Sequence, residues 1–192
     1  MAEIKSALEL ALEKAEHYGK ASAEEMAATQ YQDQGRQLAV QYLKGEGDLA
    51  SDLKNLPSQA QAAAKQAIKE VFLRNIGLPR ENTVDPRQDR ALEGLVLVAD
   101  SSKVMARLQT ELEQLMQQFI QVRSNALQQL KGRFAAGAGQ MQRNMEAQYG
   151  QKVRLDVENL PQFQEEWRRF LGQLQDQIEP MLEGLKEKMR LA

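Results

Sequence analysis

Very few side chains in this sequence have the type and spacing that chemistry requires. His17 is the sole histidine, and the chain has no cysteine. A single imidazole excludes the paired Glu-x-x-His motifs of a di-iron bundle, a His-Glu-x-x-His zinc helix and any three-histidine metal centre. The lack of cysteine excludes disulfides, thiolate zinc sites and cysteine nucleophiles. We interpret His17 as a helix C-terminal cap or an exposed side chain, in preference to a ligand or general base.

Two glycine-containing stretches fall short of phosphate-binding loops. The run Gly19 to Ser22 lacks the first glycine of G-x-x-x-x-G-K-[ST], and the run Gly137 to Gly139 lacks the downstream glycine of a dinucleotide fingerprint. Neighbouring carboxylates point to different faces of a helix and are best explained as solvated: Glu24 and Glu25, Glu111 and Glu113, Glu165 and Glu166. We therefore predict no catalytic residue, no cofactor and no metal site, and an enzyme is not the favoured class.

The sequence is organised around one long helix, expected over residues 103–149. Its apolar residues recur with a mean spacing of about 3.75, which is a helical period and not the 2.0 of a strand. They are Val104, Leu108, Leu112, Leu115, Phe119, Val122, Ala126, Leu130 and Phe134. A flank at Met105, Met116, Ile120 and Leu127 requires neighbours on two sides. Glycines at 132, 137 and 139 predict a weak joint at 135–139, through fraying or unusually close packing.

A second long helix is expected over residues 161–190 with a matching period. Pro161 lies in its first turn, and Pro180 should kink it without ending it. Its most apolar patch is Phe163, Trp167 and Phe170, close to the connection with the first helix. The short connection favours an antiparallel hairpin of about 103–149 with 161–190.

Shorter helices are expected before the hairpin, over residues 3–17, 22–44, 58–76 and 86–98. Glycines 45 and 47 should close the second, and Ser58 with Gln61 should form the capping box of the third. Gly77 fits the left-handed position of a Schellman motif at the end of the third. The run 95–99 could instead pair as a strand with 153–157, but two short strands alone are rarely stable, so we favour helix through 98.

The sequence thus predicts an all-α, elongated helical bundle. Residues 1–100 would supply the N-terminal helices and 101–192 the long hairpin, within one continuous structural unit. The first helix carries a narrow apolar face at Ile4, Leu8 and Leu12, which packs in its own bundle or docks on a partner protein.

The net charge of −2 is spread unevenly along the chain. Residues 1–56 carry 6 basic and 10 acidic side chains, whereas residues 101–150 carry 6 basic and 3 acidic ones. The simpler explanation is that acidic elements pack against the basic helix, because no aromatic side chains are interleaved to stack bases. We expect no nucleic-acid partner and, since no apolar run approaches the length of a bilayer, no membrane. The lack of both cysteine and a signal peptide favours the cytoplasm.

Three stretches together resemble an uncharacterised family of bacterial proteins of about this length. They are the opening MAEIKSALELALEKAE, the GLP at Gly77 to Pro79, and GQKVRLDVENLPQF at Gly150 to Phe163. The resemblance implies a bacterial, cytoplasmic, helical protein of unassigned activity, and it carries over no functional residue.

The long stripes and the missing site chemistry predict a non-catalytic interaction or scaffold protein with an unidentified protein partner. The alternative is an enzyme or small-ligand binder with a pocket between helices, lined by Tyr31, Tyr42, Trp167 and Phe170. Apolar surface left over after the bundle forms also predicts a homodimer, through the long helix or the N-terminal helix.

Overall fold

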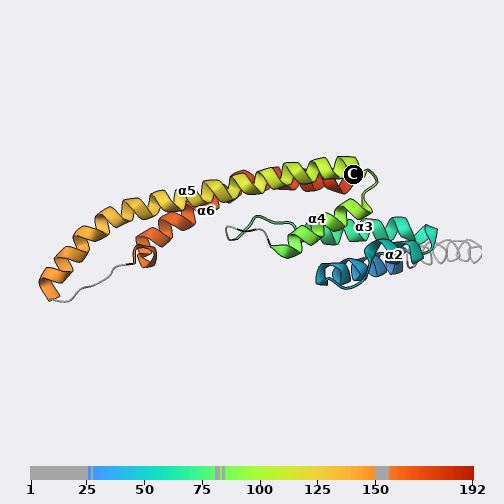
Figure 1. Cartoon of the computed structure of the whole chain (residues 1–192), viewed down its shortest axis with the longest axis horizontal. Coiled ribbons are helices and arrows are strands. Elements are labelled where there is room, and N and C mark those ends of the chain that lie inside the picture. The colour runs from blue at the N-terminus through green and yellow to red at the C-terminus, as the bar shows by residue number, and fades with distance from the viewer. Residues whose placement is uncertain (1–25, 27, 81–82, 84, 150–155) are drawn as a thin grey trace, which may run out of the picture. The chain divides into compact units, whose positions relative to one another are not determined.

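A computed structural model describes residue 26 and residues 28–80, 83, 85–149 and 156–192, with the backbone alone for 138 and 140–149. Every regular element in these residues is a helix, which confirms the predicted all-α class (Figure 1). The alternative strand at 95–99 is wrong, because residues 95–98 lie in a helix. The expected helix over 3–17, with Ile4, Leu8 and Leu12, falls outside the described residues, as does His17.

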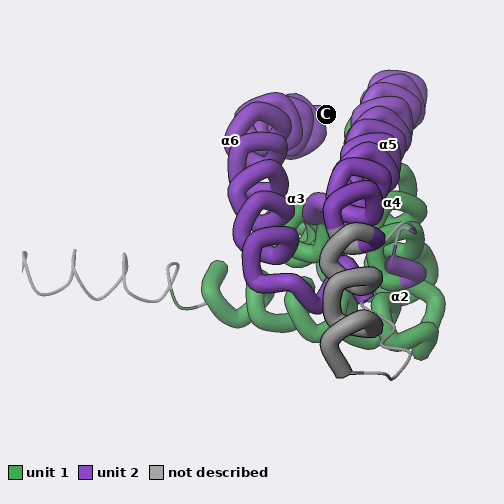
Figure 2. Tube along the Cα trace, turned by 90° about the vertical axis from the view of Figure 1, so that its left-hand side faces the viewer, with its two compact units in different colours: residues 1–76, 87–102 green, residues 77–86, 103–192 purple. Residues whose placement is uncertain are grey.

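The chain divides into two compact units, which Figure 2 shows in green and purple. Unit 1 comprises Met1–Ile76 and Arg87–Ser102, and unit 2 comprises Gly77–Pro86 and Lys103–Ala192. The prediction that both halves form one continuous unit stays a prediction.

Local chemistry sets the helix ends of unit 1. A helix over residues 28–44 ends in a Schellman motif, in which the N–H of Gly45 donates to Tyr42 O and that of Glu46 to Gln41 O, both at 2.9 Å. Gly45 has a φ of 82° and Gly47 one of 78°, the left-handed region that favours glycine. The next helix, α2 (Leu49–Asn55), is capped by Asp48, whose carboxylate accepts from the N–H of Ala50 and Ser51.

The next helix, α3 (Ser58–Arg74), corrects two expected caps. Its N-cap is Pro57, with no side-chain hydrogen bond, and Gln61 Nε2 donates to Leu56 O, so the capping box is wrong. It also ends two residues earlier than predicted, at the C-cap Asn75, whose side-chain amide donates to Val71 O. Gly77 does not have a positive φ, so its Schellman motif is wrong too.

The core of unit 1 depends on close backbone approaches. The helix α4 (Pro86–Val98) begins at the predicted proline. A Cβ added to its Gly94 would lie 2.4 Å from the ring of Phe72, which is fully buried and packs 5.8 Å from Tyr42. A Cβ on Gly35 would lie 2.5 Å from the carbonyl oxygen of Ala64 on α3. The helices therefore meet at positions where only glycine fits.

Unit 2 is built on α5 (Ser102–Tyr149), a short 3₁₀ turn η1 (Val157–Asn159) and α6 (Pro161–Leu191). Helix α5 has 48 residues, or about 70 Å at 1.5 Å per residue, and α6 lies alongside it (Figure 1). Helix α5 is unbroken over 132–139, and nothing lies within 4 Å of a Cβ at glycines 132, 137 and 139, so unusually close packing there is wrong and the weak joint at 135–139 stays a prediction. Helix α6 continues through Pro180, as predicted.

The buried stripe of α5 follows the predicted one at Leu108, Leu112, Leu115, Phe119 and Leu130 but departs from it at two valines. Val104 and Val122 are 48% and 46% exposed, although both were expected to face the core. Met105 is buried instead, and Arg123 takes the core-facing place between Phe119 and Ala126. The Nη1 atom of Arg123 is buried and has no hydrogen-bond partner in the described part of the chain. In the structure the charged side chain of Arg123 is thus part of the buried stripe and Val122 lies outside it.

Candidate functional site

The three rings of the predicted patch, Phe163, Trp167 and Phe170, differ in burial. Phe163 is buried and packs edge-on against Phe134 of α5, with ring centroids 5.4 Å apart. Trp167 and Phe170 are half-buried and stack on each other at 5.6 Å, one helical turn further along α6. Phe163 is therefore a core residue, whereas the other two rings reach the surface.

Two ion pairs join α5 to the residues that open α6. Lys131 Nζ lies 2.6 Å from a carboxylate oxygen of Glu158 in η1, and Arg133 pairs with Glu166 of α6. The side chains of Arg133 and Glu166 are 63% and 44% exposed, so these pairs contribute little stability. They do fix which residues of the two helices lie level with each other.

A hollow of about 200 Å³ opens where the aromatic pair meets α5. It is lined by residues of both helices: Ala126, Gln129, Leu130, Arg133, Glu166, Trp167 and Phe170. We call it the aromatic hollow. Its walls are the two stacked rings and its rim is the Arg133–Glu166 ion pair, so it combines apolar contact with polar groups.

A second hollow of about 450 Å³ lies further along the same two helices. Its lining is Glu111, Gln114, Leu115, Gln118, Met181, Gly184, Leu185 and Lys188. We call it the glycine hollow, because Gly184 of α6 has nothing within 4 Å of an added Cβ. Met181 lines this hollow and is 55% exposed.

Both hollows lie on one side of the hairpin. On α5 the residues that line them recur at helical spacing, and the exposed Val122 lies between the two sets on the same face. We call this face the open side. Its members on α5 are Glu111, Gln114, Leu115, Gln118, Val122, Gln129 and Arg133, and on α6 they are Glu166, Phe170, Met181, Gly184 and Lys188.

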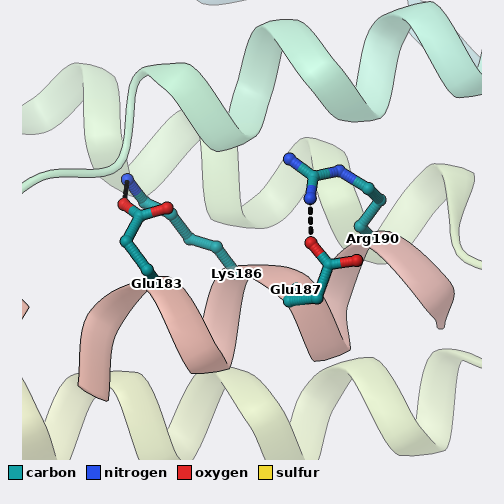
Figure 3. Close-up of polar contacts among 4 residues, drawn as sticks. All are labelled: Glu183, Lys186, Glu187 and Arg190. Carbon is teal, nitrogen blue, oxygen red and sulfur yellow. Dashed lines mark hydrogen bonds and ion pairs between the residues drawn. The ribbon is translucent and has the colours of Figure 1, made fainter. Parts of the chain in front are cut away.

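The charged side chains near the glycine hollow are mostly engaged on their own helix. Figure 3 shows Glu183 paired with Lys186, at 2.8 Å, and Glu187 paired with Arg190, each three residues apart on α6. None of these four residues is among those that line the glycine hollow. Lys188 is thus the cation of this helix turn that lines the hollow.

The described residues offer little for acid–base or metal chemistry. No group of three His, Cys, Asp or Glu side chains that could hold a metal ion occurs among them. Burial raises the pKa of Tyr42, with further contributions from the carboxylates of Glu93 and Asp48, against which Arg90 acts. The Ser51 hydroxyl, which donates to Asp48 at 2.7 Å, lowers the pKa of that capping carboxyl. Both shifts have structural causes, and neither group lines the aromatic hollow or the glycine hollow.

The alternative ligand pocket combined residues that the structure assigns to different units. Tyr31 and Tyr42 belong to unit 1, whereas Trp167 and Phe170 belong to unit 2. Sequence reasoning also missed Lys69, whose side chain is 8% exposed and whose Nζ lies 3.4 Å from Asp100. Its place between the buried Ile68 and Phe72 was the available signal.

No helix in the described part of the chain is long and apolar enough to cross a membrane. The sequence matches a family of unknown function (DUF6657) over residues 50–191, about three quarters of its length. The chain therefore belongs to this family, as the resemblance to an uncharacterised family implied. No curated protein and no protein of known structure gives a significant match.

Proposed function

We propose that this protein is a non-catalytic interaction protein that binds another protein chain on the open side of its α5–α6 hairpin. The observation that carries the proposal is the exposure of Val122 and Met181 on one face that also holds two hollows. Large apolar side chains grouped on one face, beside concave surface and rimmed by polar groups, are typical of protein-binding sites.

The shape of the open side suits a helical ligand. A groove between two helices receives an amphipathic helix whose apolar residues recur every three or four positions. The rim of the open side is rich in the uncharged amides of Gln114, Gln118 and Gln129. Amides donate and accept hydrogen bonds without a preference for charge, so these three positions would add contact without selecting a charged partner.

The cell compartment belongs to the same proposal. The described residues contain no membrane-spanning helix, and the sequence contains no cysteine. A cysteine-free chain is suited to a reducing compartment, and we place the interaction in the bacterial cytoplasm.

The test is photo-crosslinking in cells of the source organism. A photoreactive phenylalanine analogue replaces Met181 in one variant and Leu97 in the control, because Leu97 is similarly exposed, at 51%, but lies on α4. Crosslinked adducts of defined mass should form from position 181 and be absent from position 97. Equal labelling from both positions, or none from position 181, would contradict binding at the open side.

A further inference from the structure

We propose that the partner on the open side is a second copy of this chain, bound antiparallel about a two-fold axis that passes Val122 of α5. The inference rests on the proposed function and names the occupant of the same surface. It is drawn from the order in which charged side chains, a large aromatic ring and an open glycine follow each other along the two helices.

The charges on the open side are arranged symmetrically about one level of the hairpin. Glu111 lies eleven residues before Val122 and Arg133 lies eleven residues after it. A two-fold axis at Val122, at right angles to α5, therefore places Glu111 of one copy opposite Arg133 of the other. Opposite charges that meet in this way select the orientation of a complex more than they raise its affinity.

Helix α6 repeats the same symmetry at the same level. Glu166 and Lys188 lie eleven residues on either side of Gln177. Because Arg133 pairs with Glu166 and the helices are antiparallel, Gln177 lies level with Val122. One axis therefore also brings Glu166 of each copy to Lys188 of the other.

The same axis places a large side chain of one copy opposite a hollow of the other. Phe170 and Gly184 lie seven residues on either side of Gln177, so the half-buried ring of each copy would face the glycine of the other. Nothing lies within 4 Å of a Cβ at Gly184, and the hollow around it measures about 450 Å³. A parallel pair would place each hollow opposite the same hollow and leave both unfilled.

The available area is sufficient for a specific dimer. The open side extends from Glu111 to Arg133, about 33 Å at 1.5 Å per residue. Two helices with axes about 9 Å apart form a face roughly 18 Å wide. Each copy would then bury about 600 Å², so the total of about 1,200 Å² lies at the low end of the range for specific interfaces. A dimer that dissociates as the protein is diluted is expected.

The chain lacks cysteine, so one introduced thiol reports one position. In the full-length protein, Val122→Cys should give a covalent dimer with an oxidant or a short bis-maleimide, because both copies of residue 122 lie at the axis. Gln114→Cys should give none, because its two copies would lie sixteen residues apart along the helices, about 24 Å. Crosslinking of both variants would indicate the parallel pair and overturn the proposal.

A steric variant with a matched control tests the glycine hollow. Gly184→Gln fills the hollow, whereas Gly172→Gln makes the same change on α6 at a glycine that is also open but lines neither hollow. Sedimentation velocity over a dilution series should show the dimer of Gly184→Gln weakened at least tenfold and that of Gly172→Gln unchanged, with equal helicity by circular dichroism. Equal dimerisation of both variants would overturn the proposal.

A wild-type protein that stays a 21.7 kDa monomer at the highest soluble concentration would also overturn it. That result would leave the proposed interaction function standing, because the crosslinks from position 181 in cells report binding to any protein. Adducts in cells with a monomer in solution would assign the open side to a different partner.

Discussion

Replacing Gly35 by alanine should destabilise the protein, although alanine is the better helix former. A Cβ at this position would lie 2.5 Å from the carbonyl oxygen of Ala64 and 2.8 Å from its Cα. Both atoms are backbone, so the clash cannot be relieved by a rotamer change, and the helix over 28–44 must move away from α3. The sign of the effect therefore tests the close approach of these two helices.

The magnitude follows from two opposing effects. Alanine in place of glycine within a helix stabilises by about 1 kcal/mol. Overpacking a tight core contact costs about 1–3 kcal/mol, and a backbone clash belongs at the upper end of that range. We therefore expect Gly35→Ala to lower the free energy of unfolding by about 2 kcal/mol. Gly132→Ala, where nothing lies within 4 Å, should raise it by about 1 kcal/mol.

Urea titration followed by far-UV circular dichroism measures both variants. The fluorescence of Trp167, the chain's sole tryptophan, reports unit 2 alone and so separates the unit that carries Gly132 from the unit that carries Gly35. If Gly35→Ala were as stabilising as Gly132→Ala, the close contact with Ala64 would not exist and the reasoning would be refuted.

Four further substitutions test three more predictions. Trp167→Ala should cost about 1–2 kcal/mol of stability and Phe163→Ala about 3–5 kcal/mol, because only the phenylalanine is fully buried. Equal losses of stability in urea titrations would contradict this difference. Lys69→Met should leave stability in thermal unfolding unchanged or raise it, because methionine is of similar length and removes a buried charge whose partner, Asp100, is 75% exposed. A loss of more than about 2 kcal/mol of stability would show instead that the ion pair stabilises the fold. The pKa of Asp48 in the folded protein lies below its ordinary value of 3.8, so the stability that its carboxylate contributes is complete above that value and is lost as the pH falls through the folded pKa. Asp48→Asn should therefore flatten the dependence of the free energy of unfolding on pH below 4. An unchanged slope would contradict the capping role of Asp48.

Several helix ends were predictable because they depend on neighbouring residues in the chain, although both caps expected for α3 were wrong. Asp48 caps α2, Pro86 opens α4, and Gly45 closes its helix with a positive φ, each as local sequence chemistry indicates. Glycines inside helices were not predictable in the same way. Gly35 is packed against a backbone and Gly132 is open, but both occupy the same local context, and only the tertiary structure distinguishes them.

The open side was not predictable from the sequence, because the apolar pattern of α5 placed Val122 in the buried stripe. Apolar type alone assigned Val122 to the core, since valine is usually buried and arginine usually exposed. In the structure Arg123 completes the buried stripe, because four residues after Phe119 turn the helix by 400°, whereas three residues turn it by only 300°. A long arginine stem can fill an apolar seam. Val122 therefore lies outside the buried stripe and between the two hollows, and its exposure there supports the proposal that the open side binds a second chain.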